Sequence, residues 1–101
     1  MRYFISLSFN GSAFCGWQIQ NNASSVQEQL QNALQTLLKE EIKVTGAGRT
    51  DTGVNAMNYV AHFDTIQPIA FEPAYFCYKL NAILSKEITI LAISRVKNDA
   101  H

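Results

Sequence analysis

SSVQEQLQNALQTLL, residues 24–38, is the most strongly patterned stretch of the sequence. Its apolar side chains recur at intervals of three and four residues, the period of one helix face. They are Val26, Leu30, Ala33, Leu34, Leu37 and Leu38. Ser25 and Glu28 stand three residues apart at its start and form a capping box, which satisfies free amides of a helix N-terminus. The pattern predicts an amphipathic helix of about four turns beginning at Ser25.

The residues on either side of this helix read as strands and one further helix. Residues 2–9 alternate apolar and polar side chains, which indicates a strand with one buried face. Beyond the helix we expect a short strand at Ile42 and Val44, a strand from Met57 to Phe63, a helix opened by Glu72-Pro73, and a last strand over Ile88 to Val96. That last strand is apolar on both faces, so we expect it inside the sheet and covered on both sides.

The expected order is strand, helix, strand, strand, helix, strand. Two β-α-β units in this order form a split, ferredoxin-like fold, in which the helices cover one face of an antiparallel sheet. The sequence therefore predicts the α+β class and a single domain over residues 1–101.

Composition excludes several classes of protein. The chain is 48% hydrophobic and 16% charged, with a net charge of zero, which fits a globular domain and argues against binding nucleic acid by bulk charge. No apolar run approaches the ~20 residues of a membrane span, and the first residues do not form a signal peptide. We expect a cytoplasmic protein without a membrane partner. Cys15 and Cys77 form no ligand pattern and are expected as free thiols, so no metal is predicted.

One segment between two predicted strands has residue types that suit catalysis or ligand binding. It is Gly46-Ala47-Gly48-Arg49-Thr50-Asp51-Thr52-Gly53. Glycines allow the backbone to approach a ligand closely, and a carboxylate beside an arginine stays ionised and can act as nucleophile or base. The competing interpretation is a plain hairpin connection, with Asp51 bonding its own backbone and Gly53 at positive φ. A phosphate-binding loop is not indicated, because no lysine precedes Thr50 or Thr52.

Four segments resemble one enzyme family. GRTDTGVNAMNYVAHFDT (48–65) is similar to the signature of TruA-family pseudouridine synthases, and FNGSAFCGWQIQ (9–20), SSVQEQLQNAL (24–34) and LNAIL-x-x-EITI (80–90) resemble neighbouring stretches in the right order. The resemblance implies that Asp51 is catalytic and that Arg49, Thr50 and Asn55 bind RNA. It implies isomerisation of uridine on the 3′ side of the tRNA anticodon stem-loop, by a homodimer that uses no metal or cofactor.

The resemblance also implies that this chain is the N-terminal, aspartate-bearing portion of a longer enzyme, inactive or weakly active alone. The second half of such enzymes supplies a tyrosine that stacks on the target base, together with basic contacts. Asn55 stands where the family pattern usually has histidine, and Asn10 where it often has aspartate. Asparagine hydrogen-bonds but carries no titratable proton, which argues against acid–base chemistry at Asn55.

Several alternatives remain at this stage. A non-catalytic ferredoxin-like module could bind RNA or protein through its sheet, and such a binder would not depend on the carboxylate of Asp51. A small regulatory domain could pair with copies of itself through sheet edges, although this leaves the GRTD segment unexplained. Asp51 could attack the sugar, stabilise an oxocarbenium-like species or remove a proton. Trp17 and His62 are read as structural side chains rather than as RNA contacts or catalysts.

Overall fold

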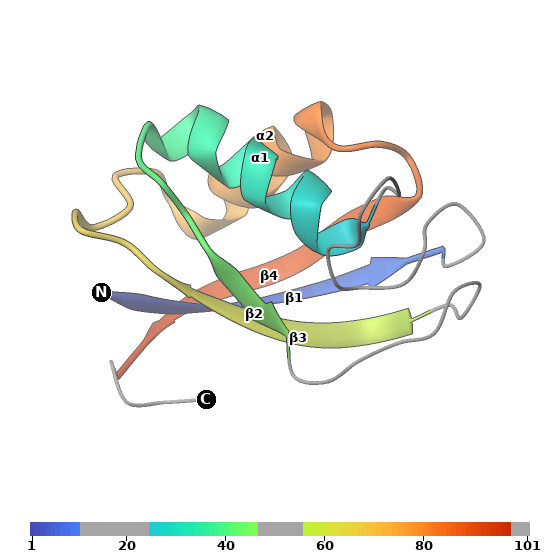
Figure 1. Cartoon of the computed structure of the whole chain (residues 1–101), viewed down its shortest axis with the longest axis horizontal. Helices are drawn as coiled ribbons and strands as arrows, with labels where there is room; N and C mark the ends of the chain where they lie inside the picture. The colour runs from blue at the N-terminus through green and yellow to red at the C-terminus, as the bar shows by residue number, and fades with distance from the viewer. Residues whose placement is uncertain (11–24, 47–55, 98–101) are drawn as a thin grey trace.

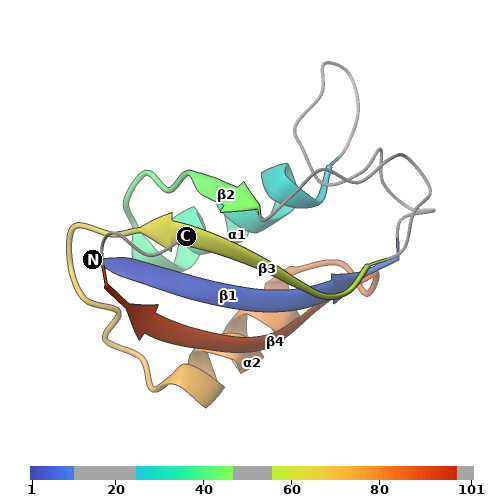
Figure 2. The ribbon, with the colours of Figure 1, turned by 90° about the horizontal axis from the view of Figure 1, so that it is seen from below.

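The computed structural model of the chain describes residues 1–10, 25–46 and 56–97. Its elements follow the predicted order: β1 Arg2–Phe9, α1 Val26–Leu38, β2 Val44–Gly46, β3 Ala56–Asp64, α2 Pro73–Ile83 and β4 Ile88–Val96. The strands form one antiparallel sheet in the order β2-β3-β1-β4. Both helices lie on the same face of this sheet (Figure 1), and Figure 2 looks onto the face that they leave open. The α+β, ferredoxin-like prediction is confirmed.

The first helix starts and ends as its sequence dictates. The Ser25 hydroxyl accepts a hydrogen bond from the Glu28 backbone N–H at 3.1 Å, which satisfies one free amide of the first turn. At the other end, Lys39 has a φ of 56° and donates its backbone N–H to Gln35 O at 2.9 Å. This left-handed residue closes the helix. The buried face is the predicted one: Val26, Leu30, Ala33 and Leu34.

The core lies between the helices and one face of the sheet. In β1 every second side chain is buried, namely Tyr3, Ile5, Leu7 and Phe9. The rings of Tyr3 and Phe63 stack with centroids 5.7 Å apart, and the fully buried Phe76 brings α2 onto the same layer. This burial of apolar surface fixes which face of the sheet the helices cover.

The last strand differs from the prediction. β4 lies at an edge of the sheet, not inside it, and Leu91 is 49% exposed. A bulge explains the misleading sequence, because Leu7 pairs with Ile90 and Ser6 with Ala92, which leaves Leu91 as an extra residue. Ile90 and Ile93 therefore both face the helices although they stand three positions apart in the sequence. The sequence of β4 is apolar on both faces because of the bulge, and not because both faces of the sheet are covered (Figure 1).

The apolar residues of α2 are not all buried. Ile83 is the last residue of this helix and is 47% exposed. The inward face of α2 is carried by Phe76 and Leu80. Cys77 is a free, half-buried thiol, and burial raises its pKa.

Candidate functional site

The residues predicted to carry chemistry lie outside the described part of the chain. Arg49, Thr50, Asp51 and Asn55 belong to residues 47–55, and Trp17 and Cys15 belong to residues 11–24. The structure describes the elements that flank these two segments, namely β1 and α1 for residues 11–24 and β2 and β3 for residues 47–55. Of the predicted site, the structure describes the flanking strands and the helix α1.

Residues 11–24 follow the end of β1, and residues 47–55 return to the sheet at this same end. β1 ends at Phe9, which pairs with Ala56 at the start of β3 and with Ile88 at the start of β4. Asn10 donates its backbone N–H to Glu87 O at 2.9 Å, which ties the end of β1 to the turn before β4. The N-terminus of α1 lies at this end as well (Figure 1). The segment containing Asp51 thus begins and ends on a sheet whose register is fixed on both sides of β1.

β2, the strand that leads into residues 47–55, is short and lies at the other edge of the sheet. Its last residue, Gly46, pairs with Ala61. β3 begins five residues before Ala61, at Ala56. Residues 47–55 therefore connect Gly46, which lies opposite Ala61, with the first residue of β3. Edge strands carry backbone groups without a strand partner, and those groups need other partners.

Three glutamines of α1 supply these partners. Gln27 donates its side-chain N–H to Val44 O at 2.7 Å, and the Gln31 side-chain oxygen accepts the Val44 N–H at 3.0 Å. Gln35 accepts the N–H of Ile42 at 3.1 Å. We call these three residues the glutamine ladder. They stand four residues apart and share one helix face, so their spacing is a signal in the sequence from which this contact could have been predicted, although it was not.

Two cavities open on the described surface. One, of about 240 Å³, is mainly apolar and lies between β4, the start of α2 and the loop before it, with Tyr3, Ile69, Phe71 and Phe76 in its wall. The other, of about 290 Å³, is polar and lies beside β2. We call it the β2 cavity; its lining residues are Arg2, Glu41, Lys43, Thr45, His62, Phe63 and Asp64.

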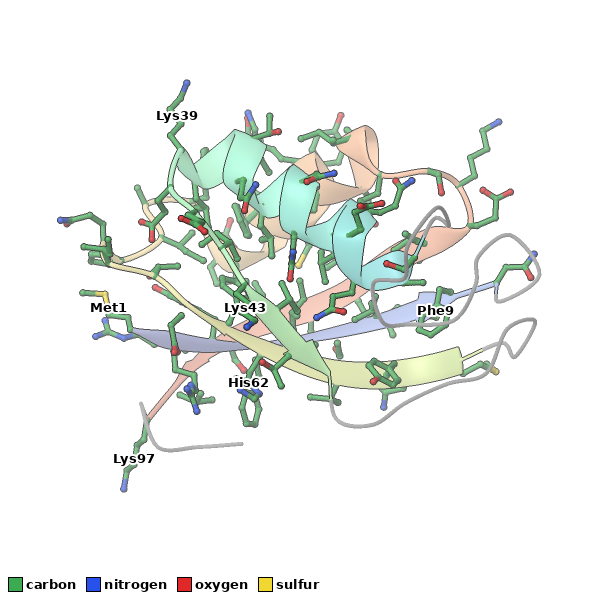
Figure 3. All side chains as sticks on the ribbon, in the orientation of Figure 1. Met1, Phe9, Lys39, Lys43, His62 and Lys97 are labelled. Atoms are coloured by element: carbon green, nitrogen blue, oxygen red, sulfur yellow. The ribbon has the colours of Figure 1, made fainter. Side chains whose placement is uncertain are left out.

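The polar side chains of the β2 cavity belong to the open face of the sheet. Neighbouring strand residues point to opposite faces, and Val44 and Phe63 are buried toward the helices. Thr45, His62 and Asp64 therefore face the other way. Figure 3 shows His62 on the side of the sheet away from the helices. Its ring lies 6.2 Å from that of Phe4, consistent with a structural packing role.

One ion pair dominates the electrostatics of this cavity. Arg2 donates from Nε to Asp64 Oδ1 at 2.8 Å and from a terminal nitrogen to Oδ2 at 3.0 Å. The hydrogen bonds from Arg2 hold the pKa of Asp64 below its usual value, and the charges of Arg2, the N-terminus and His62 act in the same direction. Asp64 is therefore ionised at neutral pH, and its charge is offset by Arg2.

The described residues contain neither a cluster of metal ligands nor a membrane-spanning helix. No three His, Cys, Asp or Glu side chains among residues 1–10, 25–46 and 56–97 gather closely enough to hold a metal ion. Within the same ranges, no helix has the length and apolar character needed to cross a membrane.

Comparison with known proteins identifies relatives of one kind. No family model matches the chain. Three curated relatives are each named tRNA pseudouridine synthase A. The protein of Bacteroides thetaiotaomicron is 47% identical over 100 residues, which is 99% of this chain and 36% of that protein. The Parabacteroides distasonis protein is 44% identical over 99% of this chain and 39% of its own length, and the Aquifex aeolicus protein is 40% identical over 96% and 39%.

Each alignment covers nearly all of this chain, so the matched region includes both the predicted site residues and the strands and helices that flank them. The chain spans about two fifths of the length of the curated relatives that it matches. Over nearly all of its own length, the chain is similar to proteins that are named tRNA pseudouridine synthase A.

Proposed function

We propose that the enzyme to which this chain belongs isomerises uridine to pseudouridine in tRNA, and that Asp51 is its catalytic carboxylate. The observation that carries the proposal is sequence identity of 40–47% with proteins of that name over almost the entire chain. The segment Gly48-Arg49-Thr50-Asp51 lies within the matched region and carries the ionisable pair that the chemistry needs.

A carboxylate suits this reaction. Pseudouridine formation breaks the bond between C1′ of the ribose and N1 of uracil, turns the base, and joins C1′ to C5. The atoms of substrate and product are the same, so the reaction needs neither an oxidant nor an energy source. A carboxylate can attack or stabilise an electron-poor sugar carbon, as carboxylates do in glycoside hydrolysis, or accept the proton that leaves C5.

The neighbours of Asp51 suit the handling of RNA. A base must leave its stack before its glycosidic bond can be reached, at a cost of a few kcal/mol. A guanidinium plane can stack on bases and pair with phosphate, so Arg49 would offset part of this cost. Thr50 and Asn55 would add neutral hydrogen bonds to the nucleotide. The proposed target is uridine on the 3′ side of the anticodon stem-loop.

The proposal also covers the rest of the enzyme. Since the chain spans about two fifths of its relatives, we assign to it the N-terminal, aspartate-bearing domain and to the remaining chain the opposite wall of the cleft. A homodimer in the cytoplasm follows from the same family resemblance. An RNA surface shared among these parts accounts for the zero net charge of this one. We expect the 101-residue chain alone to be inactive or weakly active.

Release of tritium from uracil C5 tests the reaction, because joining C1′ to C5 expels that hydrogen. The full-length enzyme is incubated with tRNA tritiated at C5, beside a matched tRNA with cytidine in place of the uridines on the 3′ side of the anticodon stem-loop. We expect release from the first tRNA only. Equal release from both would refute the proposed target, and no release from any tRNA would refute the activity. The 101-residue chain as a third sample tests whether this domain suffices.

A further inference from the structure

β3 contains a bulge close to its start, where residues 47–55 end. Leu7 of β1 pairs with Tyr59 of β3. Two positions further along β1, Phe9 pairs with Ala56, which lies three positions before Tyr59. Over this stretch β3 therefore has one residue more than its partner strand. Such an extra residue bends a strand locally, and bulges of this kind are common beside active sites.

The backbone of Asn58 makes this bulge possible. Its φ is 58°, in the left-handed region where a Cβ atom crowds the following carbonyl oxygen. Glycine adopts this region at no such cost, and asparagine is one of the few other residues that tolerate it. Within the described part of the chain, Lys39 is the only other residue besides glycine with a positive φ. A left-handed residue inside a strand persists only where its surroundings hold it.

Phe9 holds both sides of the bulge. Its backbone pairs with Ala56, before Asn58, and its ring packs edge to face against Tyr59, after Asn58, with ring centroids 5.7 Å apart. Phe9 is itself buried, and the backbone N–H of the neighbouring Asn10 is bonded to the turn before β4. The end of β1 is thus fixed, and it fixes the bulge in turn.

The bulge changes the face of the sheet to which the first residues of β3 point. Side chains of a strand alternate between two faces, and Ala61 and Phe63 are buried toward the helices. In a regular strand Met57 would share that buried face, because it stands an even number of positions before them. Met57 is instead 90% exposed. The extra residue inverts the alternation for the residues before it, so it decides how residues 47–55 join the sheet.

We propose that Asn58 is a positioning residue of the catalytic site: its left-handed backbone sets the direction in which residues 47–55, which include Asp51, join β3. This inference rests on the proposed function, since it concerns the segment proposed to be catalytic. The link is covalent, because Ala56 directly follows that segment and stands two positions before Asn58. Direction matters, because a displacement of ~1 Å at a reacting group can lower a rate about a hundredfold.

Two substitutions that differ in their tolerance of a positive φ test this role. Asn58→Gly removes the side chain and permits the left-handed backbone, whereas Asn58→Ala disfavours that backbone. Tritium release from C5-labelled tRNA is measured in a single turnover of the full-length enzyme, with enzyme in saturating excess, so that the rate reports the chemical step. We expect Asn58→Gly to keep the rate of the unmodified enzyme, and Asn58→Ala to lower it about a hundredfold.

Lys39 provides the matched control, because its φ of 56° is close to that of Asn58. It ends α1, and Figure 3 shows it at the end of the molecule away from Phe9. Lys39→Gly and Lys39→Ala remove the same charge and differ in the same backbone preference. At both positions the Ala variant should unfold about 2–4 °C below the Gly variant. Only the two variants at Asn58 should differ in rate. The penalty at one residue is small beside the stability of a domain, so all four variants should fold.

Three outcomes overturn the inference. Asn58→Ala that releases tritium as fast as Asn58→Gly shows that the left-handed backbone positions nothing. Equal losses of rate in both variants assign the effect to the side chain of Asn58. A loss in Lys39→Ala as large as in Asn58→Ala assigns it to lower stability in general. The proposed function fails separately, since an unmodified enzyme that releases no tritium refutes the reaction itself.

Discussion

Gln31 of α1 accepts a hydrogen bond from the backbone N–H of Val44, at 3.0 Å, three residues before the segment that carries Asp51 begins. Gln27 binds the carbonyl oxygen of the same residue, so both backbone groups of Val44 are held by one helix. Val44 is fully buried, and its backbone groups would otherwise lack strand partners at this edge. The glutamine ladder thereby fixes the strand from which residues 47–55 leave.

Gln31→Ala should destabilise the domain by about 1–3 kcal/mol, because it leaves a buried backbone N–H without an acceptor. Gln29→Ala is the matched control: it makes the same substitution in the same helix at a side chain outside the ladder, and it should change stability by less than about 0.5 kcal/mol. Urea unfolding followed by circular dichroism measures both. Equal effects of the two substitutions would mean that helix propensity, and not the bond to Val44, is responsible.

Ser25→Ala should lower the free energy of unfolding by about 1 kcal/mol, because the hydroxyl caps α1 and Ser25 is fully buried. Ser25→Asp keeps an acceptor for the Glu28 N–H and places a negative charge at the positive end of the helix dipole. Thermal unfolding of the three proteins should rank Ala below Asp. A Ser25→Ala protein as stable as the original would show that the cap contributes nothing.

Tyr3→Phe should cost about 1 kcal/mol of stability. The Tyr3 hydroxyl accepts the backbone N–H of Ile69 at 2.9 Å, and the substitution removes that acceptor while keeping the ring stacked on Phe63. Amide hydrogen exchange at Ile69 gives a local measurement, since this N–H should exchange faster in the variant. Unchanged protection of Ile69 would contradict the assigned bond.

The pair of Arg2 and Asp64 should make a small, pH-dependent contribution to stability. Because folding lowers the pKa of Asp64, the stabilisation is fully present above its unfolded value of about 4 and is lost as the pH falls through the lower folded value. Asp64 is 59% exposed, so the contribution is about 0.2–1 kcal/mol. Asp64→Asn should thus be less stable than the original at pH ~7 and equally stable near pH ~2. A difference that grows as the pH falls would contradict this sign.

Sequence patterns predicted the helices and strands correctly, but they did not predict that β4 lies at an edge of the sheet. The helical spacing behind Ser25 and the alternation in β1 each depend on neighbours in sequence, and both were predicted correctly. The place of β4 depends on its pairing with β1, which puts it at an edge of the sheet. The bulge at Leu91 hid this, because it changes the period of the apolar residues from two to three.

The site residues were predicted from their types, whereas the contacts around the flanking strands were found only in the structure. Arg49 and Asp51 were singled out by glycines and adjacent opposite charges, and they stay predictions because they lie outside the described residues. The glutamine ladder was not predicted, since polar residues on a helix face are ordinarily solvated. The β2 cavity joins residues from three separate parts of the chain, and no local pattern reveals such a site.

Asp51→Asn in the full-length enzyme tests the central claim most directly, with tritium release from C5-labelled tRNA as the measurement. Glu72→Gln is the control, because it neutralises an exposed carboxylate at the start of α2, where the side chain makes no capping bond. We predict that Asp51→Asn lowers the rate of release at least about a thousandfold while tRNA binding and the unfolding temperature persist, and that Glu72→Gln has no effect. Release by Asp51→Asn at a rate close to that of the unmodified enzyme would contradict the assignment of Asp51 as the catalytic residue.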